Sequence, residues 1–317
     1  MTNKTALWAI ILLAASCQDA IKNTERTGKE MPENKGPEAY VISEPRLVTP
    51  STVVHGREDL FGYWVGDFEQ DLPEDKKKYM DGWDYANKIN ISIDSLNGDS
   101  VIGHSVVAGN RRPFRGSVLL TDSVFRFKVR EPGDDKYDGV FEFSIALHDS
   151  VLKGKWLAYG EIEIPSRKFE LGKRFFRYRP EAELDDVYVD WEKFKKKKIQ
   201  FVYEDGEEEI TEDYMETYFL STTGALFDIN SSTTLLDKKT VENLSKADIF
   251  ILRNAIYAKH GYAFKKRPLR AYFDNHTWYM PVYSDIRKLL TETEKKNIQL
   301  LLSYEKHAEA YYDVFGR

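Results

Sequence analysis

Hydrophobic and polar positions alternate along much of the chain between residues 59 and 180. Three segments place an apolar residue at every second position: 89–93, 124–129 and 140–145. This period is typical of strands that bury one face. Turn sequences separate the segments, and Asn97-Gly98 is a strong hairpin signal. We therefore expect about eight short strands, and 59–180 is predicted to form an antiparallel β-barrel or sandwich domain.

The period becomes helical near Leu235, so residues 232–317 are predicted to form a small helical domain. Ser245-Lys246-Ala247-Asp248 has the spacing of a capping box, and an apolar stripe follows it. Gly261 comes after a basic turn, as a C-terminal glycine would. Thr291 to Glu294 predicts the start of a second helix in the same way. The chain is thus expected to be an α+β multidomain protein.

A charged segment, 181–231, connects the two regions. A lysine-rich run at 193–198 precedes an acidic run at 204–209, and the apolar residues beside both runs are typical of strands. The Asp205-Gly206 pair between them favours a turn. We expect a β-hairpin with charged edges, in which the two runs pair with each other more readily than with anionic lipid.

The N-terminal segment contains a short uncharged apolar run, residues 5–15, after Lys4. A bilayer-spanning helix needs about 20 residues, so the run is too short to span and indicates a secretory signal. Leu13-Ala14-Ala15-Ser16-Cys17 resembles the lipobox of bacterial lipoproteins, although that family usually has Leu where Ala14 stands. The resemblance implies that 1–17 is a signal peptide and that Cys17 is lipidated. An ordinary signal peptide with a chance cysteine is the alternative.

Residues 18–58 have a different composition from the rest of the chain. Four prolines and a single aromatic residue, Tyr40, lie among polar residues without hydrophobic periodicity. Such a segment cannot bury enough apolar surface to order itself. We predict a flexible tether between the membrane anchor and the folded part; an irregular strap packed on the domain is the alternative.

Composition and charge narrow the function classes. The 317 residues include one Cys, which excludes an intramolecular disulfide and a Cys-rich zinc module. The net charge of −6 argues against nucleic-acid binding. From Thr233 onward the chain has 15 basic and 10 acidic residues, so this part carries +5 and the remainder carries −11. The halves therefore differ in charge.

Two further resemblances concern the folded regions. Residues 252–264 (LRNAIYAKHGYAF) resemble the signature of the YARHG domain, with Lys259 where the name has Arg, and 277–281 continues the match. The likeness covers about 235–305 and implies a small helical domain of extracytoplasmic bacterial proteins, often lipoproteins, with no established biochemical role. Gly62-Tyr63-Trp64 is similar to the Gly-x-Trp opening of lipocalin-type barrels, which favours a barrel that binds a ligand.

The YARHG-like motif supplies candidate binding residues. Arg253, Tyr257 and His260 share one face of the predicted helix, since they are four and three positions apart. With Trp278 and Tyr279 they suggest a polar and aromatic pocket for a peptide or sugar. The alternative is structural: Arg253 and the neighbouring Asn254 hydrogen-bond the backbone while Tyr257 and Trp278 fill the core.

Basic residues suggest anion binding at two places. Arg111, Arg112 and Arg115 lie close together in the β-rich region and could grip carboxylate, phosphate or sulfate; ordinary pairing with acidic residues is the alternative. A second cluster could meet anionic glycan or lipid: Lys259, Lys265, Lys266, Arg267 and Arg270. The carboxylate-rich segment 131–139 is interpreted as an acidic turn, because it lacks the spacing of a Ca²⁺ loop.

These observations lead to one main functional hypothesis and two alternatives. We expect a non-catalytic protein that is lipid-anchored in the bacterial cell envelope, in the outer membrane, and that binds a cell-surface component such as a glycan, peptide or lipid. No nucleophile–base set is visible, and no metal or cofactor is expected. A cell-wall or glycan hydrolase that uses carboxylates of the β-rich domain is the alternative. A structural spacer is the third.

Overall fold

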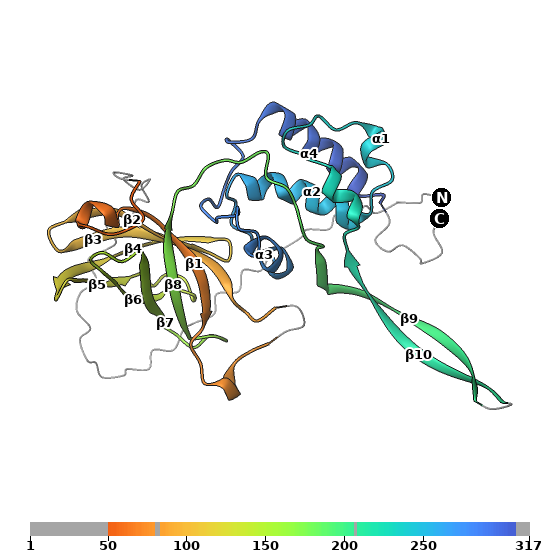
Figure 1. Cartoon of the computed structure of the whole chain (residues 1–317), viewed down its shortest axis with the longest axis horizontal. Helices are drawn as coiled ribbons and strands as arrows, with labels where there is room; N and C mark the ends of the chain where they lie inside the picture. The colour runs from red at the N-terminus through yellow and green to blue at the C-terminus, as the bar shows by residue number, and fades with distance from the viewer. Residues whose placement is uncertain (1–49, 80–82, 206–207, 309–317) are drawn as a thin grey trace, which may run out of the picture. The chain divides into compact units, whose positions relative to one another are not determined.

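The first folded region is a closed antiparallel β-barrel (Figure 1). The computed structural model describes residues 50–79, 83–205 and 208–308, so Cys17, the predicted signal peptide 1–17 and most of the predicted tether 18–58 lie outside the described residues. Each strand pairs with the next one, and β8 returns to β1. The strands are β1 (Gly62–Gln70), β2 (Asn87–Asn97), β3 (Ser100–Val107), β4 (Asn110–Thr121), β5 (Val124–Arg130), β6 (Gly139–Ala146), β7 (Val151–Ala158) and β8 (Ser166–Arg174).

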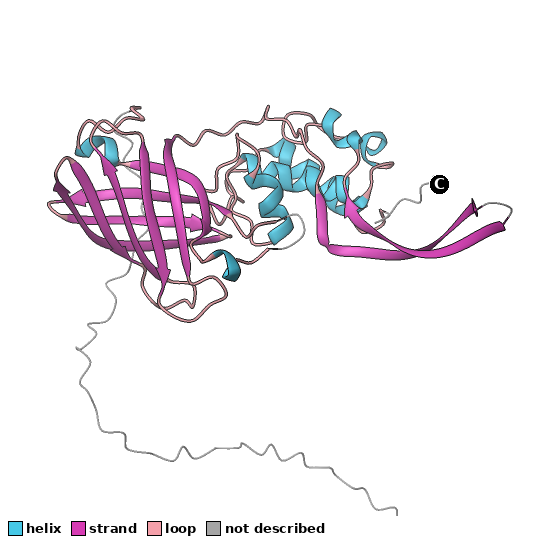
Figure 2. Ribbon diagram, turned by 60° about the horizontal axis from the view of Figure 1, so that its bottom comes forward, coloured by secondary structure: helices cyan, strands magenta, loops and turns pink. Residues whose placement is uncertain are grey.

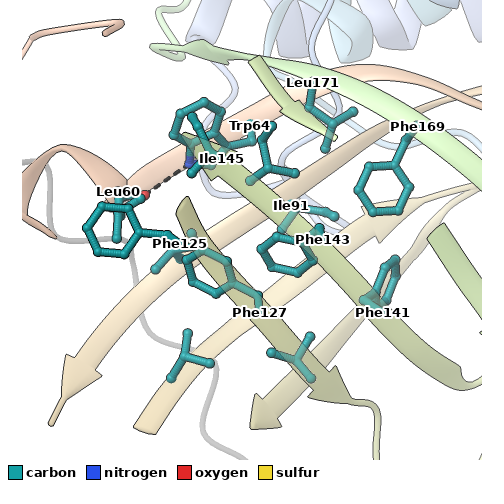
Figure 3. Close-up of a cluster of buried hydrophobic side chains, with 14 of the residues drawn as sticks. Leu60, Trp64, Ile91, Phe125, Phe127, Phe141, Phe143, Ile145, Phe169 and Leu171 are labelled. Atoms are coloured by element: carbon teal, nitrogen blue, oxygen red, sulfur yellow. Dashed lines mark hydrogen bonds between the residues drawn. The ribbon is translucent and has the colours of Figure 1, made fainter. Parts of the chain in front are cut away.

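The barrel interior is filled by the apolar residues of the alternating pattern. Phe125, Phe127 and Phe143 project inward with residues of the other strands (Figure 3). A short 3-10 helix, η1 (Arg57–Leu60), lies at one end of the barrel, where Trp64 Nε1 donates a hydrogen bond to the Leu60 carbonyl at 2.9 Å. Arg57 bonds the carbonyl of Gly98 in the β2–β3 turn, which places η1 against that end. The prediction of an antiparallel barrel followed by a helical region is confirmed.

A two-stranded hairpin follows the barrel. β9 (Val189–Asp205) and β10 (Glu208–Ser221) pair only with each other among the described strands (Figure 2). The expected pairing of the lysine run 193–198 with the acidic run 204–209 is wrong, because the acidic run lies at the end of the hairpin, where Glu204 faces Glu209 in the register. The lysine run faces the later part of β10 instead: Lys197 faces Glu216, and Lys198 forms an ion pair with Asp213 at 2.6 Å. Cross-strand pairs of opposite charge stabilise such a ladder modestly.

The C-terminal region is helical and begins with the 3-10 helix η3 (Gly224–Asp228). Its helices are α1 (Lys238–Val241), α2 (Lys246–Lys259), α3 (Arg267–Asp274) and α4 (Glu292–Glu305). Both expected helix starts are confirmed: Ser245 with Asp248 and Thr291 with Glu294 form complete capping boxes. Gly261 has a φ of +74°, and the amides of Gly261 and Tyr262 bond carbonyls of the last helical turn, which completes a Schellman motif.

The barrel and the helical region lie within one compact unit of the chain, and direct hydrogen bonds join them. The outward-facing residues of β2 meet the segment after α3. Lys88 Nζ donates to the carbonyl of His276 at 3.1 Å, and Asn90 Nδ2 donates to the carbonyl of Pro281 at 2.9 Å. The amide of Lys88 donates to Asp274 Oδ2 at 2.8 Å, and burial raises the pKa of Asp274 to about 7. These bonds hold α3 beside the barrel.

No helix in the described ranges combines the length and apolar character needed to cross a bilayer.

Candidate ligand-binding site at the barrel mouth

The barrel end opposite η1 holds a cavity of about 560 Å³, which we call the mouth. The mouth is lined by the strand ends that lie there, by the loops that join them and by residues of α3 and its approach. Pockets that bind small molecules are typically about 300–1,000 Å³ and mostly apolar. The mouth therefore has the size of a ligand site.

Aromatic side chains form much of the mouth wall. Phe68, Phe141 and Trp156 project from the strands, and their rings contact one another at the top of the filled barrel core. Trp83 and Tyr85, from the β1–β2 connection, stack with ring centroids 4.5 Å apart. Because the barrel below these rings is packed, a ligand would occupy the mouth rather than the barrel axis.

Glu131 is a buried carboxyl group in the mouth lining, 5% exposed. Its oxygens accept hydrogen bonds from the Ser105 hydroxyl at 3.0 Å, the Gly139 amide at 2.8 Å and Trp156 Nε1 at 3.2 Å. Burial raises the pKa of Glu131 to about 7, although these donors lower it in part. The Glu131 carboxyl group therefore connects the end of β5 to β3, β6 and β7 by hydrogen bonds.

Arg112 also lines the mouth, and it organises the neighbouring acidic turn. Its Nε and Nη2 atoms donate to the two oxygens of Asp138 at 2.8 and 2.6 Å, and it also contacts Asp134. The fork raises the pKa of Arg112 well above its usual value. Asp138 Oδ2 accepts the Gly133 amide as well, at 2.8 Å. The Arg112 guanidinium is therefore already paired with carboxylates of the 131–139 loop, and it stabilises the conformation of that loop.

Two other guanidinium groups line the mouth, and neither forms an ion pair with a carboxylate in the described part of the chain. Arg167 Nη1 donates to the carbonyls of Phe68 and Tyr85, at 2.7 and 2.9 Å. Arg270 Nε donates to Asn87 Oδ1 at 2.8 Å. Burial, and then the positive charge of Arg270, lower the pKa of Arg167 to about 10. Arg270 comes from α3 and Arg167 from β8, so the mouth is built by both regions of the chain.

Comparison with known proteins identifies the region that supplies Arg270. Residues 226–306 match the YARHG domain family. The C-terminal region carries a YARHG domain. This agrees with the resemblance drawn from its motif, and a YARHG domain indicates an extracytoplasmic protein. No curated protein and no solved structure gives a match to the chain.

The sequence groups four further basic residues of the YARHG domain with Arg270, and the structure separates them. Lys266 lies outside the mouth lining, 5.3 Å from the ring centre of Phe250. Lys265 and Arg267 line the mouth with Arg270, and Arg267 lies 5.7 Å from the ring centre of Trp83. Lys259 is buried instead, with Nζ donating to the carbonyl of Pro180 and to Asn230 Oδ1 at 3.0 and 2.9 Å. Burial lowers the pKa of Lys259 to about 8.

The three clustered arginines of β4 do not converge on one site. Side chains alternate along a strand, so Arg112 points to the opposite face from Arg111 and Arg115. Arg111 Nη2 lies 3.3 Å from His104 Nε2, in a buried network with Asp94. Arg115 lines a separate depression on the barrel surface. Of the three, only Arg112 lies in the mouth lining.

Within the YARHG domain, Arg253 and Tyr257 line a second cavity of about 580 Å³. The guanidinium of Arg253 forks onto Glu305, at 2.9 and 3.2 Å, so it pairs with a side chain of α4 rather than with backbone. Asn254 Nδ2 does donate to a backbone carbonyl, that of Phe250, at 2.7 Å.

The other three predicted motif residues do not line that cavity. His260 Nε2 lies 2.8 Å from Glu294 Oε2, and its ring stacks on that of Tyr178 with the ring centroids 4.2 Å apart. Trp278 Nε1 donates to the carbonyl of Glu183 at 3.1 Å. The buried Tyr279 hydroxyl donates to the carbonyl of Tyr262 at 2.8 Å. These contacts connect segments of the domain to one another and to the chain before β9.

Sequence reasoning missed three side chains of the mouth: Trp83, Tyr85 and Arg167. The only local signal was the Trp-x-Tyr pair within a polar stretch. Arg167 lies among alternating polar residues at the start of β8, where nothing distinguishes it from an ordinary surface arginine. In the described part of the chain, no group of three or more His, Cys, Asp and Glu side chains is arranged to hold a metal ion.

Proposed function

We propose that the protein is a lipid-anchored binding protein of the bacterial cell envelope, in the outer membrane, and that its barrel mouth takes up part of an envelope glycan, peptide or lipid. The observation that supports this most directly is the mouth itself, a cavity of about 560 Å³ with aromatic walls and basic side chains. The YARHG domain supports an extracytoplasmic location.

The anchor in this proposal is Cys17. A diacylglycerol thioether together with an N-acyl chain supplies more than one hydrocarbon chain, which suffices for stable membrane attachment. Cys17→Ser should therefore move the protein from the membrane fraction to the soluble fraction. If the variant remains with membranes, the lipid-anchor part of the proposal is wrong.

The mouth can be tested by filling it. Asn110 lies in the mouth lining at the beginning of β4, and Thr121 ends the same strand outside the lining. Asn110→Trp should reduce the capture of isolated envelope material by the purified protein, whereas Thr121→Trp serves as the matched control. Equal capture by the two variants would contradict binding in the mouth.

A cell-wall or glycan hydrolase stays the alternative, with Glu131 and Asp138 as its carboxylates. A general acid must present a free carboxyl group to the substrate. Both oxygens of Glu131 and both oxygens of Asp138 already accept hydrogen bonds from the chain. This arrangement favours binding over hydrolysis. Release of soluble sugars from envelope glycan, abolished in Glu131→Gln, would support the hydrolase instead.

A further inference from the structure

The charge balance inside the mouth points to the chemistry of its ligand. Of the carboxylates that the structure describes, none lies within the 4.0 Å ion-pairing distance of Arg167 or Arg270. Asp138 is held by Arg112, and Glu163 lies 3.6 Å from Arg267. The two guanidinium groups are therefore half-buried in the lining of one cavity, and neither has an ion-pair partner among the described residues.

The bonds that these two groups do make position them without neutralising them. Carbonyl oxygens of Phe68 and Tyr85 orient Arg167 through one nitrogen, Nη1. Asn87 and the carbonyl of Lys265 orient Arg270 through Nε and Nη1. Arginine offers five N–H donors in a planar fork, so donors remain on each side chain. Planar forks of this kind match carboxylate and phosphate groups.

Burial and neighbouring positive charge both disfavour the charged forms of these arginines. Burial, and then the charge of Arg270, lower the pKa of Arg167, while Asp84 and Glu163 oppose this more weakly. Burial also lowers the pKa of Arg270; Asp274 opposes this shift, and the charge of Arg267 adds to it. A partly desolvated pair of like charges is unfavourable until an anion lies between or beside them. The same two residues lie against the aromatic wall: Arg167 lies 5.1 Å from the ring centre of Phe68, and Arg270 lies 5.4 Å from that of Trp83.

We infer that the mouth binds a small amphipathic anion, whose carboxylate or phosphate is held by Arg167 of the barrel and Arg270 of the YARHG domain and whose apolar body lies against the aromatic wall. This inference rests on the proposed binding function of the mouth. It adds that ligand binding joins the two regions, since each contributes one arginine. The barrel or the YARHG domain alone would present only half of this site.

Matched eight-carbon probes test the inference. Octanoate and octyl phosphate carry the two candidate anionic groups, 1-octanol is neutral, and octylammonium is cationic. Binding to the full chain carrying Cys17→Ser, which leaves no acyl chain at Cys17, is measured by calorimetry and by tryptophan fluorescence, because Trp83 and Trp156 line the mouth. At least one anion should bind about tenfold or more tightly than 1-octanol, and the better anion identifies the head group.

Variants then assign that preference to the arginines. Arg167→Met and Arg270→Met keep an unbranched apolar stem and should each weaken binding of the anion about tenfold, without changing the affinity for 1-octanol. Arg126→Met, at an exposed position on β5, is the matched control and should change neither affinity. Salt provides a test in the unsubstituted mouth: raising ionic strength should weaken binding of the anion and leave 1-octanol unaffected.

The outcomes separate the inference from the proposed function. Equal affinities for the anions and 1-octanol, unchanged by salt and by both arginine variants, would overturn the arginine pair as an anion site while leaving the mouth as a binding site. If no probe binds, the inference is also overturned. Unchanged capture of envelope material by Asn110→Trp would count against the proposed function itself.

Discussion

Replacing Glu294 by Gln should destabilise the YARHG domain far more than its single-atom change suggests. The Glu294 side chain is 0% exposed. Its Oε1 atom accepts the Tyr178 hydroxyl at 2.9 Å, and its Oε2 atom accepts His260 Nε2 at 2.8 Å and the Thr291 amide at 2.9 Å. These three donors come from the segment after β8, the end of α2 and the N-cap of α4. One carboxylate therefore connects three parts of the fold.

The cost follows from the number of donors. Glutamine has one oxygen, so its NH₂ group must face at least one of the three donors. Each hydrogen bond to a charged acceptor contributes about 1.5–3 kcal/mol, and an unmatched buried donor adds to the loss. We expect the free energy of unfolding to fall by about 3 kcal/mol, measured by urea denaturation with circular dichroism. Glu292→Gln, which breaks only an exposed pair with Lys295, should leave the free energy of unfolding almost unchanged.

The pH dependence provides a second measurement on the same pair of proteins. Burial raises the pKa of Glu294, but hydrogen bonds from His260, Thr291 and Tyr178 outweigh burial and hold the pKa below its ordinary value of 4.5. Stabilisation from a lowered pKa is present above the unfolded value and is lost as pH falls through the folded one. The difference between wild type and Glu294→Gln should therefore shrink at acidic pH. A difference that is constant with pH, or equal losses in the two variants, would refute the reasoning.

Two further predictions concern Arg253 and Glu131. Arg253→Ala should lower the free energy of unfolding by about 1–2 kcal/mol. Adding Glu305→Ala should cost little more, because each substitution alone already removes the partly buried ion pair between the two side chains. Fully additive losses in the double variant would contradict this. The pKa of Glu131 is raised from 4.5 to about 7, so its stabilisation is complete below pH 4.5 and is lost as pH rises to 7. Glu131→Gln should abolish that loss in denaturation at several pH values, and an unchanged pH profile would count against it.

The features that could be predicted from the sequence depend on residues close together in the chain. The capping boxes at Ser245 and Thr291 each join side chains and amides three positions apart, so their spacing alone identifies them. Gly261 follows from the same local logic, because a left-handed residue ends the helix. The barrel strands follow from alternation, since an inward-facing residue at every second position needs no knowledge of the partner strand.

The features that could not be predicted depend on partners far away in the chain. The sequence leaves Arg253 either in a ligand pocket or bonded to the backbone, yet its guanidinium pairs with Glu305 in a helix that packs against its own. β2 reads as a strand with polar outer residues, but Lys88 and Asn90 are buried because the YARHG domain supplies carbonyl acceptors for them. Burial of a polar side chain depends on what covers it, and the covering segment leaves no trace in the local pattern.

The mouth combines both situations. The sequence predicts that the basic cluster with Lys265, Arg267 and Arg270 meets an anion, but it places no ligand cavity beside this cluster. Contacts of Lys88 and Asn90 with the YARHG domain hold α3 at the barrel, and this brings Arg270 into the mouth lining with Arg167. Two half-buried arginines that form no ion pair with a described carboxylate are unfavourable where a surface serves only for packing. Its position over aromatic rings in a cavity is better explained if the domain contact exists to complete a site for an anion.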